Sequence, residues 1–228
     1  MKGIGVVNFG DPDVLEIVEL PEVHAAQDEV RIRVHAVTVN PTDTMLRNGS
    51  RAEALKKDPP PYIPGMDIAG VIDEIGPNST SEISVGDQVM AMVVPVRDHG
   101  AYRESIVLQT DSVVKIPQGS TLIEASTLPM NGLTARLSLD ELALQPGQTL
   151  AVTGAAGCYG GYVVQLAKAE GLRVIADSSE ADQQLVYDLG ADVVVPRGDD
   201  ISEQIRKVLP EGVDGLADGA VQREFAVG

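Results

Sequence analysis

The chain has 228 residues, of which 43% are hydrophobic and 22% charged, and its formal net charge is −17 at pH 7. This composition is typical of a globular protein, and it argues against nucleic acid as a partner, which usually requires a clustered basic face. No apolar run approaches the ~18–20 residues of a membrane span, and the N-terminus lacks the apolar core of a signal peptide. The single cysteine excludes an intrachain disulfide. We therefore expect a cytoplasmic protein with neither nucleic acid nor membrane as its partner.

The first part of the chain predicts short β-strands. The segment VRIRVHAVTVN alternates apolar and polar side chains, which is the pattern of a half-buried strand. Four further short runs follow, separated by Gly, Pro, Asn and Asp: IAGVIDEIG, GDQVMAMVV, AYRESIVL and SVVKIP. Many closely spaced strands indicate a small barrel or sandwich, so we expect a β domain over residues 1–120.

After residue 120 the pattern changes to alternating strands and helices. The expected strands are TLAVT, RVIAD, DVVVP and VDGLAD. Ser179 and Asp182 form a capping-box-like start of the middle helix, and Gly190 is a suitable end. Strands that recur every ~20 residues with helical crossovers indicate right-handed βαβ units. We therefore expect an α/β domain with a parallel sheet over residues 121–228.

A glycine-rich loop, TGAAGCYGG, joins the first of these strands to a helix that begins near Tyr159. Gly154 can make the tight turn, Gly157 can let the backbone approach a pyrophosphate, and Gly160 can allow close helix–strand packing. The positive end of the helix dipole then faces the phosphates. No Gly-Lys-Ser/Thr follows, which excludes a phosphate-loop NTPase. The loop predicts a dinucleotide site, with an ordinary tight turn as the alternative.

Asp177 directly follows the second strand of this pattern. An acidic side chain there can accept hydrogen bonds from the ribose hydroxyls of NAD, and it would repel the 2′-phosphate of NADP. The alternative is a charge that interacts with a helix dipole.

These features together resemble the zinc-independent quinone oxidoreductases of the medium-chain dehydrogenase/reductase superfamily. The resemblance covers nearly the whole chain and rests on motifs in the family's order: VHAVTVNPTD, IPGMDIAGVIDEIG, GAYRESIVL, ASTLPMNGLTA, TGAAGCYGGYVVQLAK and LGADVVV. It implies an α/β protein with a β domain, in which a GroES-like barrel precedes an incomplete Rossmann doubly wound parallel sheet. It also implies NAD(P)H-dependent hydride transfer to a quinone or α,β-unsaturated carbonyl, a small-molecule substrate, and possible homo-oligomers.

The resemblance also assigns candidate site residues. Asn40, Asp43 and Asp67 would be catalytic, although the first two can also form an Asx-type turn and Asp67 can simply satisfy backbone donors. Thr134 would contact the nicotinamide, with helix packing as the alternative. The full set of expected cofactor-binding residues is Thr134, Gly154, Ala155, Ala156, Gly157, Tyr159, Gly160, Asp177, Ser178, Ser179 and Arg197.

No metal site is expected. Zinc-dependent members of the superfamily place a cysteine at the position of Asn40 and a histidine–glutamate pair near Met66 and Asp67. Asn40 and Met66 are poor zinc ligands, and Cys158 lies in the glycine loop. The three histidines are scattered along the chain and are expected to be surface or barrel residues.

The chain departs from the family pattern at several positions. Met45 stands where some relatives carry a tyrosine, so solvent would have to supply the proton. Relatives that use NADPH often have a small residue at the position of Asp177 and a tyrosine at that of Pro196. The family favours NADPH and Asp177 favours NADH; we favour NADPH, with Ser178, Ser179 and Arg197 as partners of its 2′-phosphate.

The resemblance further implies two more sheet strands and a returning segment beyond Gly228. The chain is therefore expected to be truncated relative to the family, or to need another chain that covers its sheet edge. Its catalytic competence alone is an open question. Two other functions stay open: an enoyl reductase that acts on acyl thioesters, and a non-catalytic dinucleotide-binding or partner-dependent module.

Overall fold

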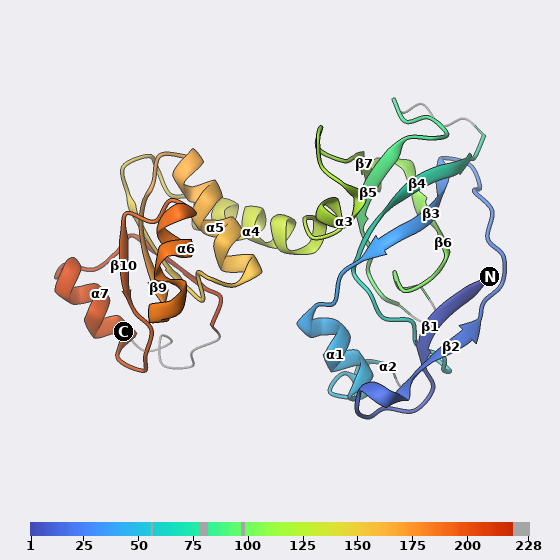
Figure 1. Cartoon of the computed structure of the whole chain (residues 1–228), viewed down its shortest axis with the longest axis horizontal. Coiled ribbons are helices and arrows are strands. Elements are labelled where there is room, and N and C mark those ends of the chain that lie inside the picture. Colours follow the sequence, from blue (N-terminus) through green and yellow to red (C-terminus); the bar gives the residue numbers. More distant parts are fainter. Residues whose placement is uncertain (56, 78–81, 97–98, 221–228) are drawn as a thin grey trace. The chain divides into compact units, whose positions relative to one another are not determined.

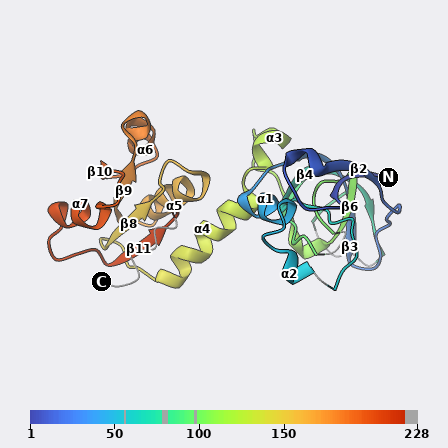
Figure 2. The same cartoon turned by 90° about the horizontal axis from the view of Figure 1, so that it is seen from below.

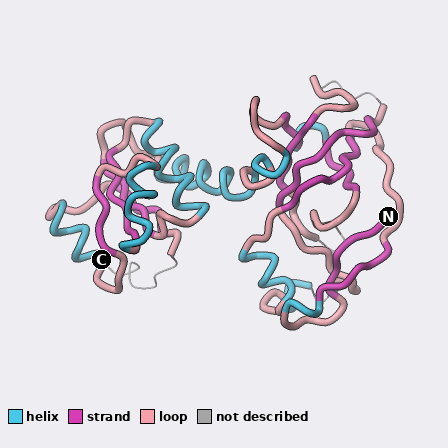
Figure 3. Tube along the Cα trace, in the orientation of Figure 1, coloured by secondary structure: helices cyan, strands magenta, loops and turns pink. Residues whose placement is uncertain are grey.

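A computed structural model describes the chain except at residues 56, 78–81, 97–98 and 221–228 (Figure 1). The chain folds as two compact units, Met1–Met130 and Asn131–Gly228, and each is described by itself. Strands predominate in the first unit, whereas helices and strands alternate in the second (Figure 3). None of the helices in the described ranges has the length and apolar character needed to cross a membrane.

The first unit is built mainly from antiparallel strands. Five strands form one sheet in the order β6-β3-β4-β5-β7, and β1 pairs with β2. The strand bounds are β1 (Lys2–Val6), β2 (Leu15–Glu19), β3 (Glu29–Val37), β4 (Asp67–Ile75), β5 (Gln88–Met92), β6 (Ser105–Gln109) and β7 (Val113–Lys115). The five strands of the sheet correspond to the five runs predicted from alternation and turn residues.

Burial along the strands explains the curvature of this sheet. In β3, Val30 and Ile32 are buried, whereas Arg33 and His35 are exposed, as the alternation predicts. All five strands contribute to one apolar cluster, which includes Val30, Ile32, Ile68, Ile72, Val89, Ala91, Ile106, Leu108 and Val113. Because side chains from every strand meet in a single core, the sheet wraps around that core as a small barrel does.

Short helices connect the strands and carry several candidate site residues. Their bounds are α1 (Pro41–Arg47), α2 (Ala52–Leu55), α3 (Leu122–Ala125) and α4 (Pro129–Leu142), with 3-10 turns at Pro12–Val14 and Thr110–Ser112. Helix α1 follows β3 closely, and Asn40 is its N-cap residue. The division between the two units falls inside α4, and the predicted domain boundary at residue 120 lies before α3.

The second unit contains a parallel sheet with the strand order β10-β9-β8-β11 (Figure 2). The elements are β8 (Thr149–Thr153), α5 (Cys158–Ala169), β9 (Arg173–Ser178), a 3-10 turn (Glu180–Asp182), α6 (Gln183–Asp188), β10 (Val193–Pro196), α7 (Ile201–Val208) and β11 (Gly215–Asp218). Every predicted strand and crossover helix is present, and the parallel sheet is confirmed.

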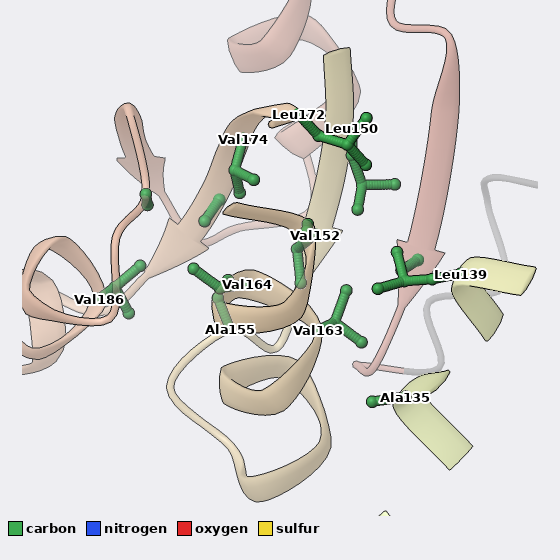
Figure 4. Packing of buried hydrophobic residues seen from close by; sticks show 14 of the residues in the cluster. Ala135, Leu139, Leu150, Val152, Ala155, Val163, Val164, Leu172, Val174 and Val186 are labelled. Carbon is green, nitrogen blue, oxygen red and sulfur yellow. The ribbon is translucent and has the colours of Figure 1, made fainter. Parts of the chain in front are cut away.

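Helices cover both faces of the parallel sheet. In β9, Val174 (Figure 4) belongs with Ala176 to the core formed with α5 and α6, whereas Ile175 packs with Ile201 and Ile205 of α7. Burial of a Val or Ile side chain contributes roughly 1.5–3 kcal/mol. The two cores fix the register of the strands and therefore the position of the loops at their carboxyl ends, which gives the doubly wound arrangement expected from the sequence.

Aspartates brace the amino ends of two strands. Asp192 accepts the N–H of Val174 in β9 at 2.7 Å and pairs with Lys168 at 2.8 Å. Asp214 accepts the N–H of Thr149 in β8 at 2.7 Å. Each carboxylate accepts a hydrogen bond from a backbone N–H near the start of a neighbouring strand. These N–H groups at the amino ends of the strands are therefore satisfied by side chains of the same unit.

Candidate functional site

The glycine loop connects β8 to α5 at the carboxyl edge of the parallel sheet. Gly154 has φ +65°, a left-handed conformation that glycine adopts without strain. A Cβ on Gly160 would overlap the carbonyl of Gly154 and lie 2.8 Å from the Cα of Ala155. The turn at Gly154 and the close packing at Gly160 are thus confirmed, while the phosphate contact at Gly157 stays a prediction.

Helix α5 begins immediately after this loop, with Gly157 as its N-cap residue. The N–H groups of the first turn of a helix have no intrahelical acceptor, and the helix dipole adds positive potential there. A Cβ on Gly157 would meet only the carbonyl oxygen of Gly154, at 3.1 Å, so its other sides are open. An open backbone at a helix N-terminus fits the pyrophosphate of a dinucleotide.

Asp177 lies beneath this loop. Its side chain has no exposed surface. Oδ1 accepts the N–H of Ala155 at 3.3 Å, and Oδ2 accepts the Nε–H of Arg197 at 3.2 Å. Both carboxylate oxygens therefore have protein partners, and the ribose contact predicted for Asp177 stays a prediction.

The other residues predicted near the 2′-phosphate differ in their exposure. Ser178 is buried, whereas the Arg197 side chain is 40% exposed. The Ser179 hydroxyl accepts the N–H of Asp182 at 3.3 Å and donates to its Oδ2 at 2.7 Å. Ser179 therefore caps the 3-10 turn that leads into α6, as predicted. Arg197 is the one cationic side chain among these three residues, and it is partly exposed.

Thr134 and Tyr159 are brought together through a residue that the sequence did not single out. The Tyr159 hydroxyl donates to Ser138 Oγ at 2.9 Å, and Ser138 Oγ donates to the carbonyl oxygen of Thr134 at 2.8 Å. Ala156, in the loop, packs against the same core as Tyr159. The chain of hydrogen bonds ties the start of α5 to α4, beside the glycine loop.

Asp218 is a second residue that the sequence analysis missed. It ends β11, opposite Thr153 at the end of β8. The Thr153 hydroxyl donates to Asp218 Oδ1 at 2.5 Å, and the N–H of Ala220 donates to the same oxygen at 3.0 Å. The carboxyl ends of parallel strands meet at the same edge of a sheet. A carboxylate at the end of the fourth predicted strand could therefore have been expected near the glycine loop.

The candidate catalytic residues of the first unit also lie together. Asp43 is buried in the first turn of α1, where its Oδ2 accepts the N–H of Asn40 at 2.8 Å. Its Oδ1 accepts the N–H of Gly65 at 2.9 Å. Asp43 thus joins the turn that begins α1 to the segment that leads into β4, which directly supports the alternative of a structural turn.

Asp67 completes this buried cluster. Its Oδ2 accepts hydrogen bonds from Asn40 Nδ2 and Thr38 Oγ1, both at 2.6 Å. Its Oδ1 accepts the N–H of Met130, near the start of α4, also at 2.6 Å. The predicted residues Asn40, Asp43 and Asp67 are therefore in one network, although their catalytic role is a prediction.

Burial changes the acid–base properties of the cluster. It raises the pKa of the Asp43 carboxyl above its usual range, although the N–H donors of Asn40 and Gly65 act in the opposite direction. Burial, followed by the negative charge of Asp43, also raises the pKa of the Tyr102 phenol. The Tyr102 hydroxyl lies 3.4 Å from Asp43 Oδ2 and 3.2 Å from the carbonyl oxygen of Thr38, to which it donates. A phenol with a raised pKa releases its proton less readily, which makes Tyr102 a poor general acid.

A cavity of about 290 Å³ opens beside this cluster. Thr42 and Met66, the sequence neighbours of Asp43 and Asp67, both line it, and the Thr42 hydroxyl lies 3.0 Å from Met66 Sδ. Its other walls are mainly apolar. A larger cavity, of about 500 Å³, lies between β1, β2 and β3 and reaches Tyr102. Asn40, Asp43 and Asp67 do not line the smaller cavity, which adjoins the network only through Thr42 and Met66. Its mainly apolar walls make it a candidate for a small apolar substrate.

No group of three or more His, Cys, Asp or Glu side chains in the described part of the chain could hold a metal ion. At the positions where zinc ligands would be expected, the Asn40 side-chain amide donates a hydrogen bond to Asp67, and Met66 Sδ accepts one from the Thr42 hydroxyl. His24 pairs with Glu74 at 3.0 Å and has an exposed side chain.

Comparison with known proteins places this geometry among oxidoreductases. The model of the alcohol dehydrogenase GroES-like domain matches residues 26–118. Human quinone oxidoreductase is 31% identical over 223 residues, which cover 94% of this chain and 64% of the human protein. The chain thus spans less than two thirds of the length of that relative.

Two solved structures have the same fold. The quinone oxidoreductase of Coxiella burnetii matches with a TM-score of 0.82 and 30% identity, over 96% of this chain and 68% of that chain. A mycobacterial protein whose structure was solved in complex with NADPH matches with a TM-score of 0.80 and 30% identity, over 95% of this chain and 66% of that chain.

Proposed function

The chain belongs to the quinone oxidoreductase family of the medium-chain dehydrogenases/reductases, and on this premise we propose that it reduces a quinone or an α,β-unsaturated carbonyl with NAD(P)H and without zinc. Its fold is the family's GroES-like barrel followed by a partial Rossmann sheet. The observation that carries the proposal is the open glycine loop at the N-terminus of α5.

The second unit would hold the cofactor. A bound nicotinamide dinucleotide supplies the hydride in this chemistry. The loop from Gly154 to Gly160 would receive the pyrophosphate, because its backbone is open and the first turn of α5 offers N–H donors. Thr134 and Tyr159 would lie toward the nicotinamide, braced through Ser138.

We favour NADPH over NADH as the cofactor. Arg197 is partly exposed and can donate to a 2′-phosphate, with Ser178 and Ser179 close to it in the chain. Glu180 and Asp182 follow these serines in the chain, and their negative charges act against the binding of the 2′-phosphate. The preference for NADPH is also supported by the mycobacterial relative, which was solved in complex with NADPH.

The first unit would orient and polarise the substrate. Asn40, held by Asp67, is placed beside the buried Asp43, so the three side chains form a preorganised polar group. Their sequence neighbours Thr42 and Met66 line the smaller cavity. Met45 is 47% exposed and offers no proton, which leaves solvent as the proton source. Tyr102 is a poorer candidate for the donor, since burial and the negative charge of Asp43 raise the pKa of its phenol.

Fluorescence titration with NADPH and NADH tests the cofactor site. Gly157→Ala adds a methyl group where the phosphate would approach, and we expect it to weaken both nucleotides at least about tenfold. Gly161→Ala is the matched control, because Gly161 is buried in α5, where its Cβ would lie 3.3 Å from Leu189 and 3.6 Å from the carbonyl oxygen of Ala155 and not at the open backbone of Gly157. If Gly157→Ala binds both nucleotides as well as Gly161→Ala does, the loop is not the phosphate site.

A substrate panel then distinguishes the remaining functions. Turnover of quinones or enones with NADPH supports the proposal, whereas turnover restricted to enoyl thioesters favours an enoyl reductase. Nucleotide binding without turnover of any of these substrates favours a non-catalytic module. The exposed Met45, which stands where a phenol could donate a proton, supports that last alternative.

A further inference from the structure

Asp177 stands at the carboxyl end of β9, but no part of its side chain is exposed. An acceptor for ribose hydroxyls has to present an oxygen to the ligand. Both oxygens of Asp177 instead contact the protein, one the N–H of Ala155 and the other the Nε–H of Arg197. We propose that Asp177 is a positioning residue, which holds the glycine loop and orients Arg197, and does not itself contact the cofactor. This inference rests on the proposed nucleotide site.

The contact with Ala155 fixes the loop from below. Ala155 is fully buried and lies between Gly154, at a left-handed φ, and the open backbone at Gly157. Its N–H is held by Asp177 Oδ1 at 3.3 Å. Loss of that acceptor leaves a buried donor unsatisfied, and the loop has to rearrange to recover a partner. The effect reaches any dinucleotide, because both cofactors share the pyrophosphate.

The contact with Arg197 fixes a guanidinium at the ends of β9 and β10. The guanidinium is planar, so a bond at Nε restricts the direction of its two terminal nitrogens. Those nitrogens have no hydrogen bond to any residue in the described ranges, and the side chain is 40% exposed. The backbone N–H of Arg197 also donates to the carbonyl oxygen of Ser178 at 2.9 Å. Asp177 therefore holds the Arg197 guanidinium in an orientation in which its terminal nitrogens can reach a ligand from solvent.

The two roles of Asp177 predict different results for the two cofactors. If Asp177 accepted the ribose hydroxyls, its loss would weaken NADH and relieve repulsion of the 2′-phosphate, so NADPH would gain relative to NADH. If Asp177 positions the loop and Arg197, its loss weakens both nucleotides, and NADPH loses at least as much as NADH. The change in the ratio of the two dissociation constants distinguishes the roles.

The experiment is a titration of the 228-residue chain with NADPH and NADH, for wild type, Asp177→Ala, Arg197→Ala and the double variant. We expect Asp177→Ala to weaken NADPH about tenfold, because an oriented charge-assisted hydrogen bond is lost. We expect Arg197→Ala to weaken NADPH and leave NADH within about twofold. In the Arg197→Ala background, Asp177→Ala should then weaken the two nucleotides equally.

Hydrogen exchange gives a readout that needs no nucleotide. In Asp177→Ala, the amides of the glycine loop should exchange at least about tenfold faster than in wild type, while those of β8 keep their protection. Asp192→Ala is the matched control, since Asp192 also joins a backbone N–H to a cation, at the opposite end of β9. It should leave loop exchange and the nucleotide ratio unchanged.

A gain of NADPH relative to NADH in Asp177→Ala would overturn the inference and support the ribose contact. Unchanged loop exchange in that variant would overturn it too. If Asp177→Ala does not fold, Asp177→Asn and the surface variant Arg197→Ala carry the same comparison of cofactors. If wild type binds neither nucleotide, the proposed function fails, and loop exchange still decides whether Asp177 holds the loop.

Discussion

At the scale of single residues, the two candidate sites share one device: a buried carboxylate that holds backbone donors. Asp43 and Asp67 do so in the first unit, and Asp177 does so in the second. In each case the carboxylate joins segments that are far apart in the sequence. The side chains that motif reading selects as catalytic or cofactor-binding are thus also the ones that fix the shape of the site.

Asp43 makes stability depend on pH. Burial raises the pKa of its carboxyl in the folded state, so the folded chain binds more protons than the unfolded chain between the unfolded pKa, about 3.9, and the raised value. The contribution of Asp43 to stability is therefore fully present below that unfolded value and is lost as the pH rises through the folded pKa.

Asp43→Asn removes this titration. We expect the free energy of unfolding of wild type, minus that of Asp43→Asn, to decrease as the pH rises from about 3.5 and then to level off. Urea unfolding of both proteins across that range measures the difference, in which the other titrating groups cancel. A difference that is flat or that rises with pH would contradict the raised pKa.

The sequence predicted several of these residues but not their partners. Asn40, Asp43 and Asp67 belong to recognisable motifs. Ser179 caps the turn that begins at Glu180 by accepting the N–H of Asp182, as the local spacing predicts. Thr38 and Gly65 lie in the same motifs, but nothing along the chain marks them as partners of Asp67 and Asp43, and Ser138 lies outside every motif. Local chemistry can be derived from neighbours along the chain, whereas tertiary partners require the fold.

At the scale of elements, periodicity was sufficient for the sheets. The strand β3 follows its alternation, and the four parallel strands follow their short apolar runs because two cores bury both faces. Gly190, with φ +112°, follows Leu189, the C-cap residue of α6, as the sequence predicts. The burial of Asp177 could not be predicted, because a residue at a strand end can point into the sheet edge or out of it.

The link between α4 and α5 supports the start of α5. Tyr159→Phe should lower the free energy of unfolding by about 1 kcal/mol, because it removes the hydrogen bond to Ser138. Ser138→Ala removes that bond and also its own bond to the carbonyl oxygen of Thr134, so it should cost at least as much. The double variant should lose little more than Ser138→Ala alone. Denaturant unfolding of the four proteins measures this coupling, and additive losses would show that the two side chains do not act together.

At the scale of the whole molecule, the chain combines a β unit that carries a buried polar network with a parallel α/β unit that carries the glycine loop. The acidic surface, with its net charge of −17, works against an anionic ligand at long range. Local positive potential at the N-terminus of α5 and at Arg197 would have to overcome it. We therefore expect nucleotide affinity to increase as added salt screens the surface charge, up to about 0.15 M.

Titration with NADPH at several ionic strengths checks this expectation. Because the phosphates of a bound nucleotide would contact the chain directly while the repulsive charges are distant, moderate salt should screen the repulsion more than the attraction. A monotonic fall in affinity from the lowest ionic strength would instead show that local attraction dominates at all distances.

The central claim is that the glycine loop forms a dinucleotide site that prefers NADPH. Thermal unfolding of the purified chain, alone and with NADPH or NADH at a matched concentration, tests it most directly. A ligand at about 100 times its dissociation constant stabilises the native state by about 2.7 kcal/mol. We predict that both nucleotides raise the unfolding temperature and that NADPH raises it more. An unfolding temperature that neither nucleotide changes would contradict the site, and a larger shift with NADH would contradict the preference.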